Sequence, residues 1–255
     1  MTEAEARARL AAAGVDDPGG NAARLRRAAA DDAIYAAWID RRAAREPVAR
    51  ILGRRSFWAH DFMVTPDVLD PRPDTETLVE VALAAPFERV LDLGTGSGCI
   101  LVSLLHERLG ATGLGTDVLQ RALAVAKRNA EVAGVAPRAA FRQADWFAGV
   151  EGVFDLIVSN PPYIAAAEID TLAPEVRDWE PRGALTPGGD GLDAYRSIAA
   201  GVRDHLAPGG RLVVEIGASQ AKAVMGLVAA AGLTGIVVTR DLNGRDRVVS
   251  AVKSR

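Results

Sequence analysis

The sequence is poor in the residues that form crosslinks and metal sites. It contains a single cysteine, Cys99, which excludes an internal disulfide and indicates a reducing compartment. Its three histidines, His60, His106 and His205, are too scattered to suggest a set of metal ligands. No apolar run reaches the ~18 residues of a membrane span, and the first residues lack the apolar segment of a signal peptide. We therefore expect a cytoplasmic protein without a bound metal.

The chain also lacks a strong excess of charge of either sign. It has 30 Lys and Arg against 33 Asp and Glu, a net charge of −3, which argues against a protein that binds phosphate backbones. Residues 1–60 are mildly basic, with 11 Arg and 8 acidic side chains, as in a solvated helical surface. A chain of 255 residues, 49% of them hydrophobic, can bury one sizeable core and still form a small second domain.

Three stretches of different character divide the chain. Residues 1–48 are rich in Ala and Arg, and their apolar residues recur at helical intervals, which predicts a small helical domain. In residues 49–66, β-branched and aromatic residues gather around a glycine, which predicts a β-hairpin connector. Residues 67–255 then form the main domain, which begins with a Pro-rich turn and a helix capped by Asp74 or Thr75.

The main domain alternates strand-like and helical segments. Near-continuous apolar strands joined by helices predict a mostly parallel sheet that is covered on both faces. The last two strands are separated by only a few residues around "LNGR", which permits an antiparallel hairpin and no crossover. This α/β layout resembles the Rossmann-like fold of the class I S-adenosylmethionine-dependent methyltransferases, with seven strands. The expected strands are 89–93, 112–117, 138–143, 154–159, 211–216, 235–241 and 247–252; the expected helices are 97–109, 119–133, 192–206 and 219–231.

A glycine-rich loop follows the first of these strands, in "LDLGTGSGCI". Glycines at such a turn let the backbone approach a ligand closely, and the helix that follows offers free N–H groups. Asp117 ends the second strand about 20 residues later, where a carboxylate can accept both hydroxyls of a ribose. The sequence therefore predicts a nucleotide-like ligand, held by Asp117 and by the loop residues Gly94, Thr95, Gly96, Ser97 and Gly98.

The loop does not match a dinucleotide site. Such sites usually read G-x-G-x-x-G, whereas this spacing is G-x-G-x-G and follows an acid, Asp92. S-adenosylmethionine has no phosphate and carries a sulfonium cation, so it fits an acidic neighbourhood better. Asp145 and Trp146 follow the third strand, where they could bind the adenine amino group and flank its ring. Ordinary packing of Trp146 beneath the sheet edge is the alternative interpretation.

The fourth strand ends in "VSNPPY", which places Asn160, Pro161, Pro162 and Tyr163 at the carboxyl edge of the sheet. The two prolines fix the backbone and carry no N–H, which leaves the Asn160 side-chain oxygen and the Pro161 carbonyl as two acceptors for one NH2 group. We also expect Asn160 to contact the cofactor. The ring of Tyr163 offers a face for a planar amide or base. Such positioning favours a nitrogen whose lone pair points at a methyl donor, so no general base is needed to begin the transfer.

The combination of motifs resembles the HemK family, the release factor glutamine methyltransferases, over residues 41–255. The matching segments are "EPVARILG", "PRPDTE", "VLDLGTGSGCI", "SNPPYI", "EPRGAL", "GGDGLDAYR" and "EIGASQ". The resemblance implies methylation of the N5 amide nitrogen of the Gln in the Gly-Gly-Gln motif of peptide chain release factors. It also implies that the substrate amide is held by Asn160, Pro161, Pro162 and Tyr163, that Glu180 contacts the substrate, and that residues 164–191 cover the target Gln.

Two features depart from the family pattern. The helical segment before "EPVARILG", which in the family grips the release factor, is short, and Asp70 stands where an apolar residue is more usual. The alternatives are methylation of a ribosomal protein glutamine, methylation of an adenine amino group in DNA, and a nucleotide-binding module without catalysis. A DNA enzyme would need a basic groove or an added recognition domain, and the sequence shows neither. We expect a monomer.

Overall fold

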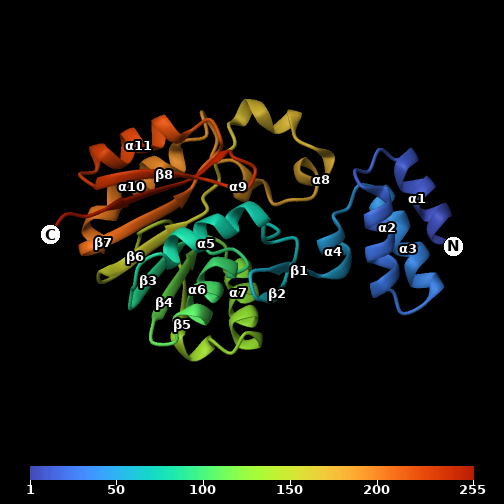
Figure 1. Ribbon diagram of the computed structural model, residues 1–255, viewed down its shortest axis with the longest axis horizontal. Helices are drawn as coiled ribbons and strands as arrows, with labels where there is room; N and C mark the ends of the chain where they lie inside the picture. The colour runs from blue at the N-terminus through green and yellow to red at the C-terminus, as the bar shows by residue number, and fades with distance from the viewer.

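The computed structural model describes residues 1–255 and consists of a small helical domain, a hairpin and a larger α/β domain (Figure 1). In the helical domain, Leu10, Leu25 and Ile39 are fully buried, as their helical spacing predicts. Ile34 stays exposed, and Tyr35 takes the buried position four residues before Ile39 instead. The helices of this part are α1 Glu3–Ala12, α2 Pro18–Ala28, α3 Asp32–Ala43 and α4 Val48–Leu52.

The predicted hairpin is present but begins later than expected. Residues 49–52, which the sequence placed at the start of the connector, belong to helix α4, whose Val48 and Ile51 complete the core of the helical domain. Gly53 ends this helix with φ +69, a left-handed conformation that glycine adopts at little cost. The two strands β1 Arg54–Phe57 and β2 His60–Met63 then pair in antiparallel fashion.

The α/β domain contains the expected seven-stranded sheet, in the order β5-β4-β3-β6-β7-β9-β8. Neighbouring strands from β5 to β7 run parallel, whereas β9 pairs in antiparallel fashion with both β7 and β8, so the predicted fold class is confirmed. The first strand of the sheet, β3, lies near its centre. β4 and β5 are added on one side of β3 and β6 on the other, so the direction in which strands are added reverses between β3 and β6. Ligands bind at such a reversal. The strands are β3 Arg89–Leu93, β4 Thr112–Asp117, β5 Ala139–Gln143, β6 Phe154–Ser159, β7 Leu206–Glu215, β8 Thr234–Arg240 and β9 Asp246–Val252.

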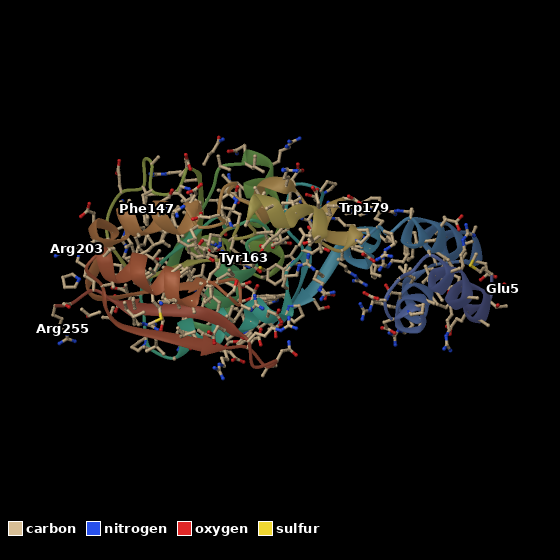
Figure 2. The ribbon with its side chains drawn as sticks, turned by 90° about the horizontal axis from the view of Figure 1, so that it is seen from above. Glu5, Phe147, Tyr163, Trp179, Arg203 and Arg255 are labelled. Atoms are coloured by element: carbon tan, nitrogen blue, oxygen red, sulfur yellow. The ribbon has the colours of Figure 1, made fainter.

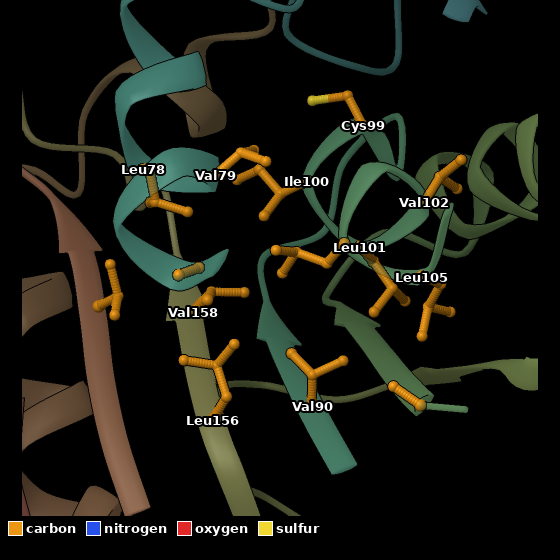
Figure 3. Close-up of a cluster of buried hydrophobic side chains, with 14 of the residues drawn as sticks. Leu78, Val79, Val90, Cys99, Ile100, Leu101, Val102, Leu105, Leu156 and Val158 are labelled. Atoms are coloured by element: carbon orange, nitrogen blue, oxygen red, sulfur yellow. The ribbon is translucent and has the colours of Figure 1, made fainter. Parts of the chain in front are cut away.

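Helices cover both faces of the sheet. Figure 3 shows side chains of α5 and α6 packed on Val90, Leu156 and Val158, while the next residues along the same strands, Leu91 and Ile157, pack on the opposite face. This alternation follows from the two-residue period of a strand. On the first face lie α5 Glu76–Leu83, α6 Cys99–Glu107 and α7 Gln120–Val132; on the second lie α10 Asp193–His205 and α11 Ala221–Ala230. Short 3-10 turns occur at Pro73–Thr75 and Ala136–Arg138.

The segment after β6 crosses from the sheet edge to the helical domain (Figure 1). It contains the 3-10 turn Ala166–Thr171 and the short helices α8 Pro174–Arg177 and α9 Arg182–Leu185. Glu175 in α8 forms ion pairs with Arg42 and Arg45, so charged contacts link this segment to the helical domain. None of the helices is long and apolar enough to cross a membrane.

Candidate functional site

A cavity of about 340 Å³ lies at the carboxyl ends of β3, β4 and β6. Most of the residues that the sequence singled out line it: Gly94, Thr95, Gly96, Ser97, Asp117, Asp145, Trp146, Asn160 and Pro162. Gly98, Pro161, Tyr163 and Glu180 do not line the cavity directly. The fold thus brings the predicted cofactor loop and the Asn-Pro-Pro-Tyr segment to one site, although they are more than sixty residues apart in the sequence. No three His, Cys, Asp or Glu side chains gather in a way that could hold a metal ion.

The glycine loop adopts a conformation that only glycines accommodate easily. Gly94, Gly96 and Gly98 have φ values of +69, +54 and +80. At Gly98 a Cβ would also meet Ala126 of helix α7 at 3.1 Å, so this glycine allows two helices to approach closely. The first helical residue is therefore Cys99, two residues later than the expected start at Ser97.

The carboxylate of Asp117 is fixed by the backbone of both neighbouring loops. One oxygen accepts a hydrogen bond from the Gly96 N–H at 3.0 Å, and the other accepts one from the Leu119 N–H at 2.9 Å. Each carboxylate oxygen can accept a second hydrogen bond, so the pair remains able to bind two ligand hydroxyls. Burial raises the pKa of Asp117, against the effect of these backbone donors.

Asp92 lies fully buried beneath the same loop. One of its oxygens accepts a hydrogen bond from the Thr95 hydroxyl at 2.6 Å, and the other has no hydrogen-bond partner. Burial raises the pKa of Asp92 to about 7, although the bond from Thr95 opposes this change. A cationic ligand in the adjoining cavity would stabilise the ionised carboxylate, so this unpaired oxygen fits S-adenosylmethionine better than a phosphate-bearing nucleotide.

Asp145 and Trp146 line the cavity beyond the end of β5. Asp145 is exposed, whereas Trp146 is half-buried and packs against the apolar cluster on the second face of the sheet. Trp146 has φ +50, an uncommon conformation for a bulky side chain. The tryptophan therefore both lines the site and packs on the sheet, and the two interpretations that the sequence left open are compatible.

Asn160 is held by a residue from a distant part of the chain. Its side-chain nitrogen donates a hydrogen bond to the hydroxyl of Thr75 at 3.1 Å, just before helix α5. In this orientation the Asn160 side-chain oxygen makes no hydrogen bond within the chain, and the Pro161 carbonyl accepts none from the backbone. Two free acceptors at the sheet edge match the two N–H groups of a primary amide.

Tyr163 is fixed by two segments that follow it in the sequence. Its carbonyl oxygen accepts a hydrogen bond from the Gln220 side chain at 2.9 Å, and a Cβ at Gly191 would lie only 2.4 Å from the same oxygen. Burial, and then the charge of Glu215, raise the pKa of Tyr163 to about 12, so its hydroxyl stays protonated at neutral pH. Figure 2 places Tyr163 within the larger domain and Trp179 on the side nearer the helical domain.

Glu180 lies behind the wall of the cavity, with its side chain 1% exposed. One oxygen pairs with Arg50 at 3.2 Å and the other with Arg72 at 3.0 Å, and the Asp70 N–H also bonds to this carboxylate. Its neighbours in the sequence, Pro181, Gly183 and Ala184, line the cavity. Direct contact of Glu180 with a substrate stays a prediction, since the described contacts tie it to arginines.

The unusual Asp70 is accommodated by the same cluster. Its carboxylate lies 3.6 Å from the Arg50 guanidinium. Burial nevertheless raises the pKa of Asp70, although Arg50 and Arg72 act in the opposite direction. The departure from the family pattern is therefore compensated by arginines already present.

Sequence reasoning missed the roles of three residues. Thr75 was interpreted only as a helix cap, but its side chain accepts from Asn160 and makes no cap hydrogen bond. Glu215 and Gln220 lie in "EIGASQ", which the sequence marked as a motif without a role, and both face the Asn-Pro-Pro-Tyr segment. An acid at the end of a buried apolar strand was the available signal for Glu215.

The chain resembles known methyltransferases. Residues 57–190 match the family model described as the methyltransferase small domain. The release factor glutamine methyltransferase of Cereibacter sphaeroides is 56% identical over 95% of this chain and 94% of its own length. That of Bradyrhizobium diazoefficiens is 48% identical over 99% of this chain and 89% of its own length.

Solved structures share the fold at low identity. A methyltransferase from Pyrococcus furiosus is 17% identical, with a TM-score of 0.59 over 78% of this chain and 92% of its own. The ribosomal protein L11 methylase of Lactobacillus delbrueckii subsp. bulgaricus is 22% identical, with a TM-score of 0.55 over 75% of this chain and 84% of its own.

Proposed function

Because the chain belongs to the release factor glutamine methyltransferase family, we propose that it transfers a methyl group from S-adenosylmethionine to a glutamine side chain of a peptide chain release factor. The methylated atom is the N5 amide nitrogen of the Gln in the Gly-Gly-Gln motif. The observation that carries this proposal is the orientation of Asn160: its nitrogen is bonded to Thr75, and its oxygen is left free beside the cofactor cavity.

The cofactor is bound by the loops after β3, β4 and β5. Loop residues 94–97 line the cavity that would hold it, and Gly98 ends the loop behind them. Asp117 would accept its ribose hydroxyls, and Asp145 and Trp146 would bind and flank its adenine. When bound, S-adenosylmethionine supplies an electrophilic methyl group on a sulfonium cation. The buried Asp92 adds negative charge beneath the loop, which favours a cation in this cavity.

The substrate amide is positioned by the segment after β6. The Asn160 side-chain oxygen and the Pro161 carbonyl accept its two hydrogens, while Pro162 and Tyr163 flank its plane. Holding both hydrogens aside directs the nitrogen lone pair toward the methyl group, which is catalysis by positioning. The proton on nitrogen leaves after the transfer, so this step requires no general base. The segment 164–191 forms part of the wall through Pro181, Gly183 and Ala184.

The helical domain, residues 1–48, and the connector, residues 49–66, recognise the protein substrate. Between them lies a cleft of about 520 Å³ whose lining includes the arginines Arg24, Arg27, Arg54 and Arg55. Only Arg54 has an acidic partner, Asp61 at 3.7 Å. Burial, and then Arg24 and Arg72, lower the pKa of Arg55, as expected for crowded cations. This arginine cleft favours an acidic surface on the release factor.

The arginine cleft also bears on the DNA alternative. No basic groove is visible in the sequence, because these arginines come from two separate segments that only the fold brings together. A decisive experiment incubates the purified protein with labelled S-adenosylmethionine and a release factor, ribosomal proteins or DNA. We expect label only on the release factor, with mass spectrometry locating one methyl group on the Gly-Gly-Gln glutamine. Label on DNA or on a ribosomal protein would overturn the proposal.

We further propose that the enzyme is a monomer and acts in the cytoplasm, where its substrate is found.

A further inference from the structure

Glu215 is a buried acid that the methyl-transfer chemistry described above does not use. It ends strand β7, where Val214 pairs in register with Ser159 of β6, so Glu215 and Asn160 follow side by side at the sheet edge. Glu215 is 1% exposed, and its Oε2 oxygen has no hydrogen-bond partner. A buried carboxylate without full hydrogen bonding costs free energy, so its position calls for an explanation.

The hydroxyl of Thr75 lies between these two residues. Thr75 is 2% exposed and accepts a hydrogen bond from the Asn160 side-chain nitrogen at 3.1 Å. A hydroxyl carries only one proton. Because the Thr75 hydroxyl accepts a hydrogen bond from Asn160, its own proton must point toward another acceptor. Glu215 is the acidic side chain beside this hydroxyl: burial raises the pKa of its carboxyl, and Thr75 acts in the opposite direction.

The direction of this proton decides which end of the Asn160 amide faces the substrate. If Thr75 gives its proton to Glu215, it can only accept from Asn160, and the Asn160 oxygen must face the cavity. If Thr75 instead gave its proton to Asn160, the amide would turn, and its NH2 group would face the NH2 group of the substrate. Two donors cannot bond to each other, so the turned orientation would not hold the substrate.

We propose that Thr75 and Glu215 are positioning residues, which fix the Asn160 side chain with its oxygen toward the substrate amide. The proposal rests on the proposed methyl transfer for its functional meaning, but the coupling of the two side chains can be tested in the free protein. Glu215 acts through Thr75, and Thr75 through Asn160, so neither needs to touch the reacting atoms.

The kinetic test uses variants that remove or restore each contact. Thr75→Val removes the hydroxyl at nearly constant shape, and we expect kcat on an intact release factor to fall roughly 10- to 100-fold, with S-adenosylmethionine affinity changed little. Thr75→Ser restores the hydroxyl and should recover most of the loss. Ser103→Ala removes another fully buried hydroxyl, one that has no partner, and serves as the matched control with unchanged kcat.

A double-mutant cycle tests the coupling. Glu215→Met removes the acceptor, and we expect it to lower kcat about as much as Thr75→Val does. Because both act through one interaction, the double variant should lose no more than either single variant. Additive losses would overturn the proposal, and so would a Thr75→Val enzyme as active as the Ser103→Ala control.

A second readout needs no substrate and separates this proposal from the proposed function. Burial raises the pKa of Glu215 to about 7, so between about pH 4.5 and 7 this carboxyl ionises in the unfolded chain but stays protonated in the folded protein, and the free energy of unfolding falls as the pH rises. Glu215→Gln should therefore gain stability relative to the native protein over that range. The charged and titratable groups around Glu215 are Asp74, Arg72, Arg247, Tyr163, Tyr195 and Cys99.

The same comparison in Thr75 variants identifies the donor. If Thr75 donates to Glu215, Thr75→Val raises the pKa of this carboxyl further. In the Thr75→Val background, the stability gained by adding Glu215→Gln should then keep growing to a higher pH. In the Thr75→Ser background, this gain in stability should have the same pH dependence as in the native protein. An identical pH dependence of the melting temperature in the Val and Ser backgrounds would overturn the coupling, even if no release factor is methylated. Conversely, a shifted pH dependence together with no methylation of any release factor would refute only the proposed function.

Discussion

The carboxylate of Glu175 accepts two hydrogen bonds from the guanidinium of Arg45, at 2.8 and 2.7 Å, and so joins the segment over the cavity to the helical domain. Arg42 adds a third bond at 2.8 Å. Burial would raise the pKa of Glu175, but the hydrogen bonds from Arg45 and Arg42 outweigh it and lower the pKa to about 2. The domain that we propose for partner recognition is thus attached to the wall of the active site.

We predict that Glu175→Gln weakens this attachment. The variant should methylate an intact release factor more slowly and bind S-adenosylmethionine normally, since Glu175 does not line the cavity. Each kcal/mol lost from the free energy of unfolding should lower the melting temperature by about 2–4 °C. A lowered folded-state pKa stabilises the native protein above pH ~4.5, and this contribution is lost as the pH falls toward 2. The difference in melting temperature should accordingly vanish in acid.

The exposed Glu168 in the same segment provides the control for that prediction. Glu168→Gln removes a charge without removing an ion pair, so it should behave like the native enzyme. If both variants behave alike at neutral pH, the ion pairs of Glu175 do not couple the two parts.

Asp117→Ala should lose most of the affinity for S-adenosylmethionine. The side chain provides acceptors for the ribose and also fixes the Gly96 N–H, so its loss removes ligand contacts and loosens the loop. Losing hydrogen bonds to a charged acceptor costs about 1.5–3 kcal/mol, or roughly 10- to 150-fold in affinity. Calorimetric titration measures this change directly. Asp117→Asn keeps one acceptor oxygen and should lose less, whereas unchanged binding in the Ala variant would refute the assignment.

Asn160→Ala separates chemistry from binding. It removes an acceptor that acts on the nitrogen during transfer, so turnover should fall roughly 10²–10³-fold with a smaller loss of release factor affinity. Single-turnover measurements with saturating enzyme report the chemical step alone. A near-native single-turnover rate would contradict the role of Asn160 in the reaction.

The arginine cleft should determine the choice of protein substrate. Deleting residues 1–48 would expose Ile51, whose burial depends on that domain, so charge reversal is the sharper change. Arg24→Glu with Arg27→Glu should reduce kcat/KM on an intact release factor about 10-fold or more, most strongly at low salt. Activity on a short Gly-Gly-Gln peptide, a poor substrate throughout, should not change.

Arg7→Glu on the exposed surface of α1 is the control for the charge reversal. If the cleft variant methylates the release factor as fast as this control does, substrate choice resides in residues 164–191 and the main domain. Tight binding of DNA by the native protein, lost in the cleft variant, would indicate a nucleic-acid partner for the cleft.

The sequence by itself predicted the sheet and most of the residues that line the cavity at its edge. The prediction used local patterns: the strand periods, the glycine spacing, and the place of Asp117 and Asn160 directly after apolar strands. Because parallel strands bring their carboxyl ends to one edge of the sheet, these local patterns were enough to place the residues together. The helix limits moved by a few residues, as at Cys99, because backbone conformation at the glycine decides where a helix begins.

Only the tertiary structure decided how the site residues are supported. Thr75, Glu215 and Asn160 come from three parts of the chain, and no spacing in the sequence relates them, since their contacts depend on the packing of β6, β7 and the turn before α5. The same holds for the arginine cleft and for the arginines that pair with Glu180. Side-chain hydrogen bonds between distant segments are set by the folded geometry, and a linear pattern of residue types does not record them.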